Sequence, residues 1–112
     1  MNVNVRQRDD VTILCPKGRI TIGTGDVALR NAIQEVMASG AKKVLINMND
    51  ISTIDSSGIG ELVSAYTTAT NRGAKLKLCN LPAKVSDILT ITQLITVFDV
   101  FDSEDEAVRS FA

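Results

Sequence analysis

Apolar and polar residues alternate twice at the start of the chain, once on each side of Asp9-Asp10. The alternating apolar positions are Val3, Val5, Val11, Ile13 and Cys15. Two runs of period two separated by a turn predict a β-hairpin at one side of a sheet. Residues 18–26 follow it and contain three glycines. We expect them to form a loop that leads into a helix beginning near Asp26, which is a favourable residue at that position.

Four later segments carry helical signals. Apolar residues keep helical spacing after Asp26 until Gly40, and again from Ile59 to Ala69. Pro82 opens a third helix, because proline suits the first helical turn. Ser103 with Glu106 three residues later forms a capping box, which predicts a final helix to Phe111.

Strand signals lie between these helices. The run Val44 to Met48 is apolar, as expected of a parallel strand covered on both faces. Leu76 and Leu78 alternate with lysines, and Val97-Phe98 is a candidate for a short last strand. The order predicts an α/β fold with a mixed, mostly parallel β-sheet, an N-terminal antiparallel strand and about four helices. The length of 112 residues suits a single domain over 1–112.

Composition excludes several functions. The formal charge is −1 without a basic stripe, which disfavours direct nucleic-acid binding. We see no signal peptide and no apolar stretch long enough to span a bilayer, so we expect a cytoplasmic protein without membrane insertion. The chain contains no histidine, which removes the usual Ser-His-Asp and Cys-His catalysts. Cys15 and Cys79 are isolated, so we predict buried thiols and no metal site.

The most informative run is Ile54 to Gly60, which joins a strand-like run to a helix-like run. Its Asp55, Ser56 and Ser57 are good helix caps, and a cap alone is one interpretation. Gly58 and Gly60 both fall in the first helical part, where each costs about 1 kcal/mol relative to alanine. Such glycines suit a place where another backbone or a ligand approaches closely. If the second and third strands are parallel neighbours, this run and the 18–26 loop lie on the same rim, where partners usually bind.

The run Asp55-Ser56-Ser57-Gly58-Ile59-Gly60 resembles the D-S-S-G-aliphatic-G motif of STAS domains, specifically the bacterial anti-sigma factor antagonists. The resemblance covers nearly the whole chain and implies a STAS domain over 1–112. It implies that an anti-sigma factor serine kinase phosphorylates Ser57, binds the unmodified protein and releases the modified one. The expected partner-binding residues are Asp55, Ser56, Gly58, Ile59, Gly60, Thr21, Gly23, Thr24 and Asp26.

In that interpretation the protein is no enzyme, and it has no cofactor of its own because ATP and Mg²⁺ belong to the kinase. A serine phosphatase is a possible further partner, and we expect a monomer or weak dimer. Two alternatives stay open, a scaffold subunit of a stressosome and an accessory module of a membrane transporter. An enzyme with Ser57 as nucleophile is disfavoured because no histidine base is present.

Overall fold

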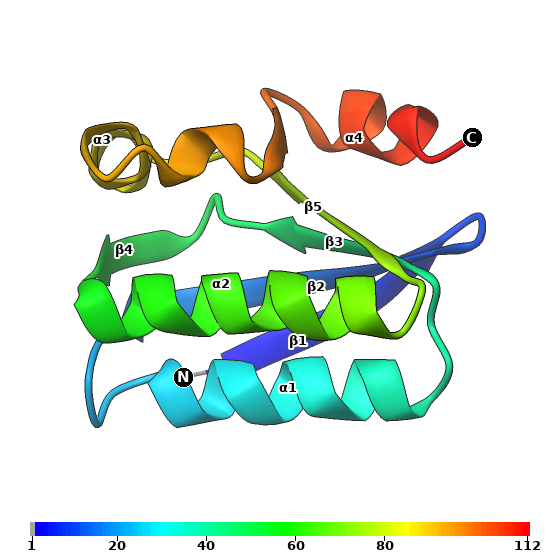
Figure 1. The fold of residues 1–112 in the computed structure, drawn as a ribbon, viewed down its shortest axis with the longest axis horizontal. Helices are drawn as coiled ribbons and strands as arrows, with labels where there is room; N and C mark the ends of the chain where they lie inside the picture. The colour runs from blue at the N-terminus through cyan, green and yellow to red at the C-terminus, as the bar shows by residue number, and fades with distance from the viewer. Residues whose placement is uncertain (1) are drawn as a thin grey trace.

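A β-sheet with helices on both faces forms the body of the protein (Figure 1). The computed structural model describes residues 2–112. The strands are β1 Asn2–Arg8, β2 Val11–Ile20, β3 Lys43–Asn47, β4 Ile51–Ile54, β5 Lys75–Cys79 and β6 Asp99–Phe101. The helices are α1 Asp26–Ala38, α2 Ser56–Asn71, α3 Ala83–Ile91 and α4 Glu104–Ser110, with a 3₁₀ helix, η1, at Leu94–Thr96.

The strand order is β1-β2-β3-β5-β6, and β4 lies off this path against β2. Only β1 with β2 is antiparallel among the strand pairs of residues 2–112, and the pairs β2–β3, β3–β5 and β5–β6 are parallel. The predicted fold class is therefore confirmed. The expectation that the second and third strands are parallel neighbours is also confirmed.

The central strand β3 is buried on both faces, as its apolar run predicts. Val44 and Ile46 join the larger core, which α1 and α2 cover. Leu45 points to the opposite face and packs in a second core with Val108 and Phe111 of the α4 region. In Figure 1, α1 and α2 lie side by side, and α4 lies on the other side of β3 and β5 from them. Successive strand residues point to opposite faces, so one uninterrupted apolar run supplies both cores.

The strand β4 was not predicted, and it changes two expectations. Residues 18–20 are not a loop: they continue β2, whose last residues pair in parallel with β4. A register shift between Gly18 and Arg19 marks a bulge, and Gly18 adopts φ +111°, a conformation that favours glycine. The loop before α1 is therefore confined to residues 21–25, and the Asp55 run follows β4 rather than the central strand.

Two smaller predictions also need correction. The last strand is Asp99–Phe101, because Val97-Phe98 follows the turn of η1 and Phe98 is buried in the larger core. The second helix begins at Ser56 with Asp55 as its cap, so Gly58 lies in its first turn as predicted. Cys79 is fully buried as predicted, whereas Cys15 is only partly buried.

An ion-pair cluster fastens α4 to the edge strand β1. Glu104, the first residue of α4, accepts hydrogen bonds from Arg6 at 2.5 Å and Arg8 at 2.8 Å, and Asn47 donates a third at 3.1 Å. The Arg6 hydrogen bond is the main reason that the pKa of Glu104 falls to about 2 from its usual 4.5; the bonds from Arg8 and Asn47 also lower it, although partial burial acts in the opposite direction. The Glu104 side chain is only 17% exposed. The cluster joins β1 to α4, two elements that are far apart in the sequence.

We predict that Glu104→Gln lowers the free energy of unfolding by roughly 1–2 kcal/mol at pH 7, a range that allows for the solvent exposure of the arginines. Because the folded-state pKa is depressed, the contribution is fully present above pH 4.5 and is lost as the pH falls towards 2. Urea unfolding at a series of pH values measures it. Glu35→Gln is the control, since Glu35 is exposed on α1 and forms no ion pair with any residue within 2–112. A gap between wild type and Glu104→Gln that is equal at pH 7 and pH 3 would contradict this account.

Candidate functional site

The candidate site is built where β4 ends and α2 begins. Asp55 is the N-cap of α2, and its Oδ1 accepts a hydrogen bond from the Gly58 amide at 3.0 Å. Its own amide donates to the carbonyl of Ile20 at 3.2 Å, which ties the cap to the end of β2. The sequence folds this way because aspartate satisfies an otherwise unpaired N–H of the first helical turn.

Gly58 allows α2 to start directly against β2. A Cβ atom at this position would lie 2.2 Å from the backbone oxygen of Ile20 and 2.5 Å from a side-chain carbon of Ile54. The close approach that the glycines predict therefore exists at Gly58, and the approaching backbone belongs to the chain itself. Gly60 differs, because nothing lies within 4 Å of a Cβ built there.

The loop before α1 forms a tight turn beside this helix start. Thr21 and Thr24 exchange two backbone hydrogen bonds, at 2.8 and 2.9 Å. At the tip, the amide of Ile22 donates to Oδ2 of Asp55 at 3.0 Å. The turn and the helix start therefore share one rim, as the sequence predicts, and Figure 1 shows both at the same end of the molecule.

The two serines differ in exposure. Ser56 is exposed in the first helical position, and Ser57 is partly exposed in the second. The Ser57 side chain makes no hydrogen bond to any residue within 2–112 that meets normal geometry. Its hydroxyl thus lies at the positive end of α2, where a negative charge is favoured.

The remaining predicted residues divide into surface and interior. Gly23, Thr24 and Gly60 are exposed, and Thr21 is partly buried. Ile59 is only 7% exposed and packs in the larger core. Asp26 is 8% exposed, and its carboxylate accepts from the Val27 amide at 2.9 Å. Ile59 and Asp26 therefore support the site from within rather than offering side chains to a partner.

One exposed apolar residue at the site was missed by sequence reasoning. Ile22 is 76% exposed at the tip of the turn, and Val27 nearby in the chain is 49% exposed. The sequence does contain one signal for this exposure: Ile22 lies between Thr21 and Gly23, in a segment too polar to bury it. The Ile22 side chain is therefore available for contact at the rim, beside the start of α2.

The Asp55 carboxylate is a fixed negative charge between these elements. Hydrogen bonds from the backbone amides of Ile22 and then Gly58 lower its pKa below the usual value. The carboxylate stays ionised at neutral pH and accepts hydrogen bonds from both amides at once. A second negative charge at Ser57 would be repelled by the Asp55 carboxylate.

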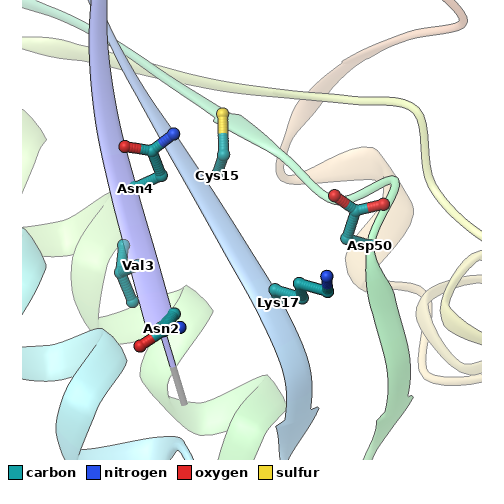
Figure 2. Close-up of a pocket in the computed structure, with 6 residues that line it drawn as sticks. All are labelled: Asn2, Val3, Asn4, Cys15, Lys17 and Asp50. Carbon is teal, nitrogen blue, oxygen red and sulfur yellow. The ribbon is translucent and has the colours of Figure 1, made fainter.

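A hollow of about 460 Å³ opens beside β1 and β2 (Figure 2). It is lined by Asn2, Val3, Asn4, Cys15, Lys17 and Asp50. None of them is a predicted site residue.

Within residues 2–112, no group of three acidic, cysteine or histidine side chains is arranged to hold a metal ion. None of the described helices has both the length and the apolar character that crossing a membrane requires.

Comparison with known proteins agrees with this geometry. The sequence profile of the STAS domain matches residues 2–107. The chain belongs to the STAS domain family. The STAS resemblance given by the Asp55–Gly60 motif is therefore confirmed, and the motif occupies the helix start that the fold places on the rim.

Relatives of this STAS protein include named regulators. It is 28% identical over 109 residues to the anti-sigma-B factor antagonist of Bacillus subtilis, covering 97% of this chain and 98% of the relative. An anti-sigma factor antagonist structure from Mycobacterium paratuberculosis has a TM-score of 0.87 at 20% identity, covering 97% and 92% of the two chains. The Bacillus cell fate determinant SpoIIAA in its phosphorylated form has a TM-score of 0.76 at 16% identity, covering 99% and 100%.

The two glycines of the motif give a matched stability test. We predict that Gly58→Ala destabilises the protein by roughly 3 kcal/mol, because the new Cβ meets a backbone oxygen that has no room to move. Gly60→Ala should leave stability unchanged or raise it by up to about 1 kcal/mol, because alanine favours the helix and the space is open. Urea unfolding of both variants measures this. Equal losses from the two substitutions would show that the Gly58 contact is not the cause.

Proposed function

We propose that this protein is an anti-sigma factor antagonist, switched by phosphorylation of Ser57. Unmodified, it binds a kinase-type anti-sigma factor, which thereby releases a sigma factor. The observation that carries the proposal is the position of Ser57, partly exposed at the start of α2 beside the exposed Ile22 turn. The names of the relatives support the same class of regulator.

The chemistry assigns the kinase step to the partner. The γ-phosphoryl group of ATP passes to the Ser57 oxygen, ADP leaves, and the hydroxyl proton goes to a base of the kinase. Phosphoryl transfer needs a nucleotide, Mg²⁺ and a base beside the hydroxyl, and in this proposal the kinase supplies all three. This protein then acts by binding in the cytoplasm rather than by catalysis. A serine phosphatase that hydrolyses the phosphate ester resets the switch.

Charge explains why one phosphate is enough. Phosphorylation adds about −1.5 to −2 charges. The start of α2 favours such a charge by roughly 0.3–1 kcal/mol, so the fold persists. A partner carboxylate about 4 Å away is repelled by roughly 4 kcal/mol per unit charge at an effective dielectric constant near 20. That is about a thousandfold in affinity, so repulsion across the interface outweighs the local gain.

Phosphorylation by the cognate kinase tests the proposal directly. With ATP and Mg²⁺, we expect phosphopeptide mapping to find one phosphate on Ser57. Ser57→Ala should not be labelled, whereas Ser56→Ala, which alters the exposed neighbour, should be. Ser57→Asp should weaken the complex at least tenfold with unchanged circular dichroism. Label that persists in Ser57→Ala would refute the assignment.

The exposed Ile22 gives an independent prediction about the interface. We expect Ile22→Ala to weaken partner binding roughly tenfold or more, because a buried isoleucine contributes about 1.5–3 kcal/mol. Isothermal titration calorimetry with unmodified protein measures this. Val5→Ala is the control, since Val5 is 48% exposed on β1, away from the rim. Equal affinities of Ile22→Ala and wild type would remove the turn from the interface.

A further inference from the structure

The Asp55 side chain joins two elements that the chain separates by more than thirty residues. One oxygen accepts from Gly58 in α2, and the other accepts from Ile22 in the turn before α1, each at 3.0 Å. Capping the helix requires only the first of these bonds. The second has no role in the helix, and it holds a residue whose side chain is 76% exposed.

The bond from Ile22 sets the direction of the exposed side chain. Thr21 and Thr24 close the base of the turn with their own backbone hydrogen bonds, in which Asp55 takes no part. The tip contains Gly23 at φ +72°, and glycine leaves the backbone free to change direction there. Among the hydrogen bonds of residues 2–112, the contact to Asp55 is the one that ties the tip to the body of the protein.

A phosphate on Ser57 competes for these contacts. It would be attached two residues after Asp55, and its oxygens are strong acceptors for the N–H groups at the start of α2. It also places about two negative charges near an ionised carboxylate. Both effects act against the present position of Asp55: the phosphate can replace it as acceptor for Gly58, and repulsion moves it away.

We propose that Asp55 is a positioning residue that transmits the state of Ser57 to the turn at residues 21–25. In the unmodified protein Asp55 holds Ile22 in its binding position. Phosphorylation displaces the carboxylate and frees the Ile22 amide, so the apolar anchor loses its fixed orientation while the phosphate repels the partner. The inference rests on the proposed function for its role in binding, but the coupling from Ser57 to Ile22 is a property of the isolated protein.

Amide hydrogen exchange measured by NMR tests this coupling. Phosphoserine is inserted at position 57 during translation, so that no kinase or partner is needed. We expect exchange of the Ile22 amide to accelerate about tenfold or more, because its acceptor is lost. The Gly58 amide should stay protected, since the phosphate replaces the carboxylate. Phosphoserine at position 56 is the control for added charge at the same helix end, and should change Ile22 less.

Substitution of Asp55 gives the complementary measurement. Asp55→Asn leaves one acceptor oxygen where aspartate has two. Asparagine at an N-cap directs that oxygen to the helix amide, so Ile22 should exchange faster while Gly58 does not. Asp87→Asn removes an exposed carboxylate of α3 and should alter neither amide. Ile22 exchange that is unchanged by both phosphoserine 57 and Asp55→Asn overturns the proposal. That result would leave the proposed function intact, whereas a kinase that fails to label Ser57 would leave the coupling intact.

A double-mutant cycle separates positioning from a general structural role. If Asp55 acts through Ile22, Asp55→Asn should weaken partner binding about fivefold to tenfold in the wild type. It should weaken binding less than twofold in the Ile22→Ala background, because the anchor that it positions is already gone. Equal losses in both backgrounds would contradict the positioning role.

Discussion

The close packing of Gly58 against the backbone of Ile20 is the constraint on which the site depends. It allows α2 to begin at the end of β2, with no side chain between them. In this arrangement the Asp55 cap also accepts a hydrogen bond from the amide of Ile22. The start of α2, Ser57 and the turn that carries Ile22 therefore meet beside the Gly58 contact.

The second core and the Glu104 cluster are separate from the candidate site, whereas the larger core reaches it through Ile20, Ile54 and Ile59. The larger core lies under α1 and α2, and the second core lies under α4 on the other face of the sheet. The Glu104 cluster binds α4 to β1 and has no residue in common with the rim around Ser57. The attachment of α4 is therefore independent of the charge at Ser57, because the two lie on different parts of the fold.

Sequence patterns predict most of this fold, and the failures have physical causes. Alternation and helical spacing locate the hairpin and helices, since each pattern is local. The strand β4 is only four residues long, contains Ser52 and Thr53, and is defined by its pairing with β2. A short stretch of sequence does not reveal pairing with a strand more than thirty residues away. The misplaced last strand has the same origin, since a three-residue strand is defined by its partner β5.

The site shows the same limit at the level of single residues. The motif identifies Ser57 and the cap from residues adjacent in sequence. The exposure of Ile22 and its bond to Asp55 depend on a contact between distant segments, and no spacing rule predicts it.

Gly60 has a consequence for shape rather than charge. Nothing lies within 4 Å of a Cβ built at this position, and Ser56, one helical turn earlier, is exposed. The surface of α2 is therefore lower at position 60 than any other residue type would make it, and a larger side chain there would change the outline of the helix without disturbing its packing.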